Sequence, residues 1–306
     1  MKGKPILVTG AHRTGTTWVG RMLAANPATA YISEPLNVLH RPGVMRAPAP
    51  FWYLYVTREN EGPLLEALHE TLAYRYHLPA ELASLRSGHD FLRMCRDAGI
   101  FLRGRLLRQR PLLKDPFAVF SLPWFARRLD CEIVVTVRHP AAFASSLKRL
   151  NWPFDFGDLL AQPLLMRDQL EPYRTGMESM PAGDIIGQAS LLWVMVYRSV
   201  QAARRSLPAV RVVRHEDLSL DPAAGFRDLY GQLGLDFTPR VEQSILRSSS
   251  SDNPAEVSRR NAHSVRLDSR ANLHNWKRRL EPEEIRRVRA LTEDVARDFY
   301  PEVEWS

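Results

Sequence analysis

The 306-residue chain has only two cysteines, Cys95 and Cys131, and they lie outside any spacing typical of metal ligands. Two cysteines cannot form the framework of a disulfide-rich secreted domain. No stretch approaches the roughly 20 apolar residues of a membrane span, and the apolar run near the N-terminus is too short for a signal peptide. These absences argue against disulfide-rich and membrane-spanning classes, and we expect a cytoplasmic location.

The composition is that of an ordinary globular protein, with 45% hydrophobic and 25% charged residues. This balance argues against disorder and against collagen-like repeats. Lysines and arginines number 42 against 34 aspartates and glutamates, so the formal net charge is +8. A surplus of this size either meets an anionic partner or keeps the surface solvated, and charge alone does not decide between the two.

Short apolar or β-branched runs alternate with longer segments of helical period along the chain. Strands that alternate with helices predict an α/β protein with a central parallel sheet flanked by helices. The predicted strands are 5–9, 29–32, 111–114, 131–137 and 210–214, and the predicted helices are 16–25, 64–74, 141–150, 189–206, 223–233 and 282–299.

No composition change marks a boundary between two domains, so we expect one domain over residues 1–306. The segment 41–110 is less regular than the rest and is rich in proline, arginine and aromatic residues. It is too long for an ordinary crossover between strands. We therefore predict a helical insertion that covers an acceptor cleft.

The residues after the first predicted strand form a glycine loop. Gly10 and Gly15 have the spacing of a phosphate-binding loop, and Thr16 opens the next helical segment. A nucleoside triphosphatase would carry lysine at position 16, whereas the only cation inside this loop is Arg13. A structural glycine turn is the alternative, but the position between a strand and a helix favours a terminal phosphate that carries a transferable group.

Residues 12–18, His-Arg-Thr-Gly-Thr-Thr-Trp, resemble the 5′-phosphosulfate loop of the sulfotransferase superfamily that uses 3′-phosphoadenosine 5′-phosphosulfate (PAPS). Arginine as the loop cation is typical of the carbohydrate and tyrosylprotein branches of that family. The resemblance implies a P-loop-type α/β fold in which Arg13 contacts the transferring sulfonate. It also implies nucleotide contacts from Thr14, Gly15, Thr16, Thr17 and Trp18.

Two later segments resemble the family's nucleotide site. Arg138 follows the predicted strand 131–137, and Ser146 lies eight residues further on, as in the family's 3′-phosphate motif. The strand 210–214 leads into His215, where the family usually has tyrosine, which leaves that contact open. Near the end of the chain, Arg270 and Lys277 resemble, loosely, the basic loop that closes over the 3′-phosphate; a solvated basic cluster explains them equally well.

Three charged residues resemble the catalytic set of the carbohydrate and tyrosylprotein branches. Glu34 has the separation from the loop cation at which those enzymes place a catalytic glutamate, and it would act as the general base. Lys114, in a Lys-Asp-Pro sequence, would stabilise charge on the bridging oxygen as its bond to sulfur breaks. The neighbouring Asp115 is a rival base or an orienter of Lys114.

The resemblance therefore implies transfer of a sulfuryl group from PAPS to an acceptor hydroxyl, with adenosine 3′,5′-bisphosphate (PAP) as the other product. The catalytic set favours a carbohydrate or glycolipid acceptor, while the arginine and aromatic residues of 41–110 also fit a lipid, a polyketide hydroxyl or a tyrosine. The sequence shows no ligand set for a metal and no module for nucleic acid, and we expect neither partner. Two alternatives remain at this point: a P-loop kinase with an atypical loop, and a non-catalytic module that binds nucleotides or polyanions.

Overall fold

A five-stranded parallel sheet forms the centre of the computed structural model, which describes residues 3–256, 266–300 and 305. The strand order is β2-β3-β1-β4-β5, and every neighbouring pair is parallel. This arrangement confirms the predicted fold class. The strands are β1 (Ile6–Gly10), β2 (Thr29–Ser33), β3 (Arg110–Lys114), β4 (Glu132–Val137) and β5 (Val210–Arg214).

The central strand β1 is buried along its whole length. Its continuous apolar sequence suits a strand covered on both faces, since alternate side chains of a strand point to opposite faces. Leu7 belongs to one hydrophobic cluster, whereas Ile6 and Val8 belong to the other. Because β1 pairs with both β3 and β4, the segments that follow these three strands meet at the same edge of the sheet.

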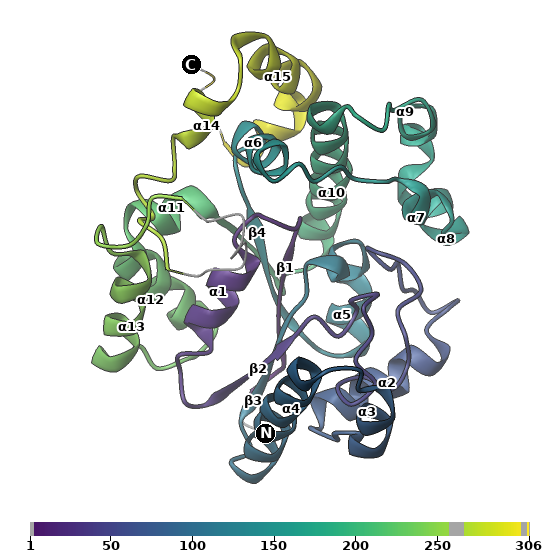
Figure 1. The fold of residues 1–306 in the computed structure, drawn as a ribbon, viewed down its shortest axis with the longest axis vertical. Helices are drawn as coiled ribbons and strands as arrows, with labels where there is room; N and C mark the ends of the chain where they lie inside the picture. Colours follow the sequence, from purple (N-terminus) through teal and green to yellow (C-terminus); the bar gives the residue numbers. More distant parts are fainter. Residues whose placement is uncertain (1–2, 257–265, 301–304, 306) are drawn as a thin grey trace.

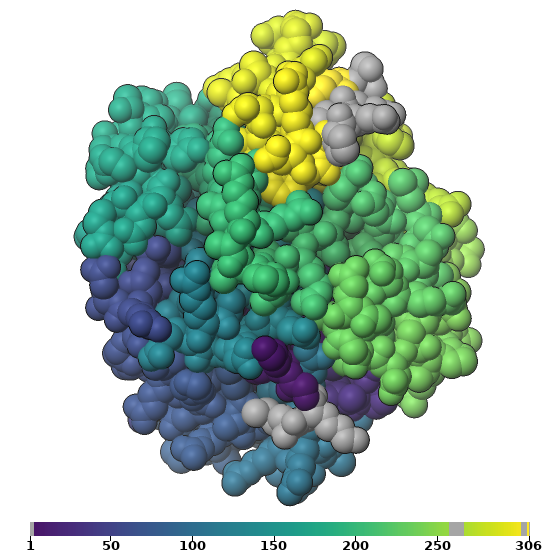
Figure 2. Space-filling view, turned by 180° about the vertical axis from the view of Figure 1, so that it is seen from behind, coloured from purple at the N-terminus to yellow at the C-terminus, as the bar shows by residue number. Residues whose placement is uncertain are grey.

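Helices cover both faces of the sheet (Figure 1). The smaller hydrophobic cluster joins one face to α1 (Thr16–Leu23), α12 (Pro222–Gln232) and α13 (Pro239–Ser249). The larger cluster covers the other face, where α6 and α10 pack against each other and against α15. Its helices are α5 (Leu122–Arg128), α6 (Pro140–Leu150), α10 (Ile185–Ser206) and α15 (Pro282–Ala296). Seen from behind, the yellow C-terminal segment lies against the green segments near residue 200 (Figure 2).

The segment 41–110 contains three helices, α2 (Gly62–Leu72), α3 (Leu78–Ser84) and α4 (Gly88–Leu106). They lie beside the β2 edge of the sheet, where α4 packs against β2 (Figure 1). The other elements are short: η1 (Pro116–Ser121), α7 (Gly157–Leu160), α8 (Pro163–Leu165), η2 (Met166–Leu170), η3 (Glu171–Tyr173), α9 (Arg174–Glu178), α11 (His215–Leu220) and α14 (Asn275–Arg279). Among the described residues, no helix combines the length and the apolarity that crossing a membrane requires.

Candidate functional site

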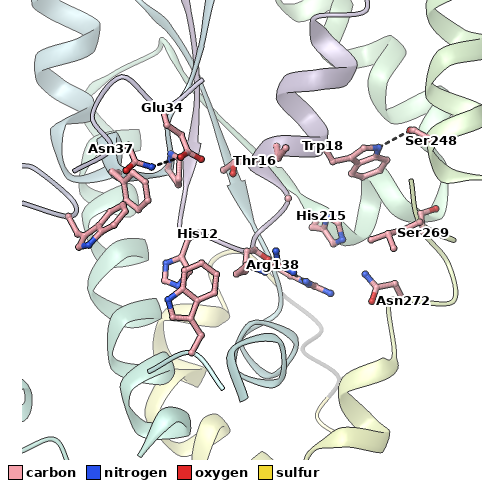
Figure 3. A pocket seen from close by; sticks show the side chains of 18 of the residues that line it. His12, Thr16, Trp18, Glu34, Asn37, Arg138, His215, Ser248, Ser269 and Asn272 are labelled. Carbon is pink, nitrogen blue, oxygen red and sulfur yellow. Dashed lines mark hydrogen bonds between the residues drawn. The ribbon is translucent and has the colours of Figure 1, made fainter. Parts of the chain in front are cut away.

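A cavity of about 380 Å³ opens at the carboxyl edge of the sheet, beside the loops that follow β1, β2 and β4 (Figure 3). Parallel α/β sheets commonly bind ligands at this edge. The cavity is lined by His12, Arg13, Gly15, Thr16, Thr17, Trp18, Glu34, Asn37, Leu39, Trp52, Pro116, Phe117, Arg138, Trp152, His215, Ser248, Leu267, Ser269 and Asn272.

Two glycines shape the loop after β1. Gly10 has a φ of 141°, and a Cβ there would lie 2.4 Å from the carbonyl oxygen of Thr136 on β4. Gly15 has a φ of 97°, and a Cβ there would lie 2.7 Å from Nδ1 of His215. Only glycine suits such positive φ values beside so close a neighbour. Gly15 is also the N-cap of α1 and offers no side chain to the first amides of that helix, whose residues Thr16 and Thr17 line the cavity.

Arg13 occupies the middle of this loop with its backbone in the left-handed region, at a φ of 66°. Its Nε donates to Oγ of Ser146 on α6 over 3.4 Å. Burial, and after it the positive charges of Arg138 and Arg149, lower the pKa of the Arg13 guanidinium to about 10. The loop cation is therefore held in a partly buried position beside other cations, where an anion would be strongly favoured.

Arg138 follows β4, and its side chain is buried at the same cavity. Its Nη1 donates to the carbonyl oxygen of Arg13 over 3.3 Å, while its own carbonyl accepts from Nε1 of Trp193 over 2.9 Å. The Nε of Arg138 has no hydrogen-bond partner in the described structure. Burial lowers the pKa of Arg138, and the cations Arg279 and Arg149 act in the same direction. The segments after β1 and β4 thus place two guanidinium groups in one cavity.

Glu34 follows β2 and also has a left-handed backbone, with a φ of 49°. For a non-glycine residue this conformation costs about 1 kcal/mol, so the surrounding contacts must hold it in place. One carboxylate oxygen forms an ion pair with the Nζ of Lys114, and the other accepts from Nδ2 of Asn37 over 2.7 Å. Glu34 lines the cavity, whereas Lys114 lies behind it, almost wholly buried.

Asp115 lies behind the cavity lining rather than in it. Its buried carboxylate accepts backbone N–H groups from Leu36 over 2.6 Å and from Phe117 over 3.0 Å, and it thereby caps η1. Burial, and after it the charge of Glu34, raise the pKa of Asp115 to about 7. This pKa suits a base, but the carboxylate does not reach the cavity, whereas Glu34 lines it. The geometry therefore favours Glu34 over Asp115 as the group that meets an acceptor.

Trp18 and His215 form another wall of the cavity (Figure 3). The indole Nε1 donates to Oγ of Ser248 over 2.9 Å, and the Trp18 and His215 rings meet edge to face at 5.6 Å. His215 is buried, and its Nδ1 has no partner among the residues described. Burial, followed by the charge of Arg138, lowers the pKa of His215 to about 3. At neutral pH this imidazole is uncharged and has an unsatisfied nitrogen.

Four of the residues predicted to bind the nucleotide do not line the cavity. The hydroxyl of Thr14 points inward, donating to the carbonyl of Ala11 over 2.6 Å. Ser146 lies behind Arg13, whose Nε donates to the Ser146 hydroxyl. Arg270 donates to the Leu220 carbonyl at the end of α11, over 2.8 and 3.0 Å, and Lys277 lies over the Trp276 ring at 5.6 Å. Instead, the late segment brings Leu267, Ser269 and Asn272 to the cavity.

The sequence did not identify several residues that shape the site. Asn37 fixes Glu34, and Trp52, Phe117 and Trp152 line the cavity. Tyr53 is fully buried, and its hydroxyl lies 2.6 Å from Nδ1 of His12 and accepts the backbone N–H of His12 over 3.1 Å. The insertion thus holds the glycine loop directly. In the sequence, the cluster of aromatic residues at 51–55 was the one indication of this contact. It did not specify which ring would reach the glycine loop.

Buried His215 makes the fold sensitive to acid, as does buried His12, whose pKa burial also lowers to about 3. The pKa of His215 is about 3 in the folded protein, whereas an exposed histidine titrates near 6.5. As pH falls below 6.5, His215 becomes protonated in the unfolded chain but stays neutral in the folded protein. The free energy of unfolding therefore decreases as the pH falls toward 3. At pH 5 this amounts to about 2 kcal/mol.

We therefore expect His215→Asn to lose less unfolding free energy than the unmodified protein between pH 7.5 and pH 5. Urea unfolding at both pH values measures the difference. Asp115, whose raised pKa acts in the opposite direction, contributes equally to both proteins and cancels in the comparison. Equal losses in the two proteins would show that His215 is protonated without penalty.

Comparison with known proteins agrees with this architecture. The sulfotransferase family model matches residues 5–239. The sulfotransferase domain from the Synechococcus PCC 7002 olefin synthase is 18% identical at a TM-score of 0.50, and the match covers 99% of this chain and 97% of that one. The sulfotransferase domain from the curacin biosynthetic pathway is 15% identical at a TM-score of 0.48, covering 95% and 98%.

Mouse sulfotransferase SULT7A1, in a structure complexed with PAP, is 14% identical at a TM-score of 0.45, with coverage of 97% of this chain and 85% of that one. No curated protein sequence matches. At 18% identity the likeness to the olefin synthase domain concerns the fold alone, and the family model carries the assignment. The chain therefore belongs to the sulfotransferase family and is a sulfotransferase enzyme.

Proposed function

We propose that the cavity binds PAPS and that the enzyme transfers its sulfuryl group to an acceptor hydroxyl on a carbohydrate or glycolipid. The observation that carries the proposal is the pair of guanidinium groups, partly buried Arg13 and buried Arg138, in one cavity with Glu34 on another wall. The charges of this pair call for an anion, and the carboxylate provides a proton acceptor.

The residues fit a nucleotide with phosphate groups at two positions. Arg138 has an unpartnered Nε, and His215 has an unpartnered Nδ1, both buried at the cavity. The glycine loop provides a second anion site, formed by Arg13 and the N-terminal end of α1. We assign the 5′-phosphosulfate to this loop and the 3′-phosphate to Arg138, with Trp18 as the stacking surface for the adenine.

PAPS supplies the sulfuryl group, which moves to the acceptor oxygen as the bond from sulfur to the 5′-phosphate oxygen breaks. In this scheme, Glu34 takes the proton of the attacking hydroxyl. Asn37 and Lys114 hold its carboxylate in the one orientation that the structure shows. Arg13 offsets the negative charge that grows on the leaving phosphate oxygen, and Lys114 remains the proposed second cation for that charge.

The acceptor side of the cavity is aromatic. Trp52 and Phe117 lie with ring centroids 4.4 Å apart, and Trp152 lines the cavity beside His12. Such rings can pack against the C–H faces of a sugar, while their edges leave room for hydroxyl groups. This lining supports the carbohydrate or glycolipid acceptor.

Calorimetry with PAP, ATP plus Mg²⁺, and heparin tests the proposed nucleotide. We expect PAP to bind, ATP to bind much more weakly, and Arg138→Ala to weaken PAP binding by at least about tenfold through loss of a charge-assisted contact. Arg204→Ala, an exposed arginine on α10, is the matched control and should bind PAP normally. Magnesium-dependent ATP turnover would favour a kinase, and heparin binding without PAP binding would favour a polyanion module.

A panel of hydroxylated acceptors incubated with PAPS then tests the transfer. Mass spectrometry should detect a product that is heavier by one SO₃ group. A sugar or glycolipid product supports the proposed acceptor class. Sulfation of only phenolic or peptide hydroxyls would contradict that class while leaving the sulfuryl transfer intact.

A further inference from the structure

Exposed apolar side chains concentrate on one part of the insertion. Of the twelve large hydrophobic residues exposed in the described part of the chain, seven lie between residues 78 and 107. Isolated exposed leucines are common, but a concentration of this kind marks an interaction surface. The seven are Leu78, Leu82, Phe91, Leu92, Leu102, Leu106 and Leu107.

The helix α4 has two different apolar faces. Its inner face is buried: Phe101 meets the rings of Tyr74 and Tyr76 at 6.0 and 5.3 Å, and Asp97 pairs with Arg41. The outer face carries exposed small or apolar residues three or four positions apart, so they share one stripe along the helix. These residues are Phe91, Leu92, Cys95, Gly99, Leu102 and Leu106, and we call them the outer stripe.

The inner contacts anchor α4 to the protein, so the outer stripe does not fold back into the core. Leu92 is 69% exposed and Leu106 is 71% exposed. In Figure 1, α3 and α4 lie at the periphery of the molecule, at the end remote from α14 and α15. The outer stripe is therefore presented at an accessible edge.

Arginines border the outer stripe. Arg96 and Arg103 lie along one side of it and Arg105 along the other. Arg96 and Arg103 also line a groove of about 480 Å³ together with Arg21 of α1 and Arg240 of α13. Asp97 lines the same groove and pairs with Arg96 over 3.0 Å. In the described structure, no carboxylate pairs with the guanidinium group of Arg21, Arg103 or Arg240, so the groove keeps a positive charge beside the apolar stripe.

From this placement, we infer that the outer stripe and its arginines form a docking face for an anionic lipid bilayer. A leucine and phenylalanine face bordered by cations is the pattern of a helix that lies in the membrane interface, where each arginine interacts with anionic headgroups. A second copy of this chain fits less well, because it would bring the same arginines face to face. A single partner helix would cover only one narrow stripe of side chains. The exposed residues extend more widely, over α3, α4 and the turn at Leu107.

Cys95 provides a direct test because it is exposed within the outer stripe, whereas Cys131, the other cysteine, is buried. An environment-sensitive nitrobenzoxadiazole fluorophore on Cys95 should shift to the blue with vesicles of phosphatidylcholine and phosphatidylglycerol, and not with phosphatidylcholine alone. Raising the salt from about 0.1 M to about 0.5 M should reverse the shift, because screening weakens the arginine contacts. The same fluorophore on Leu291→Cys in a Cys95→Ser protein should not respond. An unshifted Cys95 label with the anionic vesicles overturns the proposal.

Sedimentation with the same vesicles tests whether residues of the outer stripe are needed for membrane binding. We expect Leu102→Asp/Leu106→Asp to lose vesicle binding by at least about tenfold, since two apolar anchors are replaced by charges that anionic lipid repels. The control Leu246→Asp/Leu291→Asp changes two leucines that are each 48% exposed on other helices and should bind as the unmodified protein does. Thermal unfolding of both variants establishes that they fold.

Two outcomes contradict the bilayer as the occupant. Equal vesicle binding by the stripe variant and the control would show that the stripe does not dock. A stable dimer in light scattering that Leu102→Asp/Leu106→Asp dissociates would instead assign the face to a second copy. Neither result bears on the nucleotide cavity, because none of the substituted residues lines it.

Discussion

Replacing Arg13 by alanine should reduce sulfuryl transfer by more than about a hundredfold while the fold is retained. Removal of one preorganised group that stabilises transition-state charge commonly has an effect of this size. Arg13 is held for that task by Ser146 and by the contact between its carbonyl and Arg138. Steady-state kinetics with saturating PAPS, together with thermal unfolding, measure both parts of the prediction.

Arg13→Lys distinguishes charge from geometry. Lysine keeps the charge but lacks the planar group that contacts Ser146, so we expect partial activity between that of alanine and arginine. Arg204→Ala again controls for loss of a surface arginine. Near-normal turnover in Arg13→Ala would remove the glycine loop from the mechanism, even if PAP still bound.

Replacing Glu34 by glutamine should reduce kcat by more than about a hundredfold, because an amide cannot accept the acceptor's proton. Glutamine keeps the size of the side chain and an oxygen for Asn37, but it leaves the buried Lys114 without its counter-charge. Some loss of stability is therefore expected as well. PAP binding, measured by calorimetry, should persist and would separate lost chemistry from lost folding.

Asp115→Asn and Asn37→Ala complete the comparison. Asp115 caps η1, so Asp115→Asn should lower the free energy of unfolding. The kcat per folded molecule should change little. Asn37→Ala frees one oxygen of Glu34 and should lower kcat less than Glu34→Gln does, with an altered pH profile. If Asp115→Asn alone abolished turnover while Glu34→Gln retained it, Asp115 would be the base.

Much of the fold was predictable because local sequence and burial agree. The short, continuous apolar runs of β1 and β4 are typical of strands that are buried on both faces of a parallel sheet. The strand β5 was predicted with its observed bounds. The predicted helix 189–206 missed its first turn, which begins at Ile185 because the Asp184 side chain accepts the N–H of Gly187. That cap was visible in the sequence as an aspartate three residues before a glycine.

The candidate site was predictable where it depends on strand ends and not where it depends on long-range packing. Arg13, Glu34 and Arg138 follow three parallel strands, so a parallel sheet brings them to one edge. No local pattern specifies that Tyr53 holds His12, since 41 residues separate them. Likewise, the capping role of Asp115 depends on Leu36, which lies 79 residues away.

The left-handed backbone at Arg13 and Glu34 sets a limit on how this enzyme can be made more robust. Glycine adopts that conformation freely, so a laboratory search for thermostable variants would tend to accept glycine at position 13, whereas glycine at position 34 would leave the buried Lys114 without its counter-charge. A gain at position 13 would remove a side chain on which we expect turnover to depend. A stabilising library for this protein should therefore keep residues 13 and 34 fixed and vary the remainder.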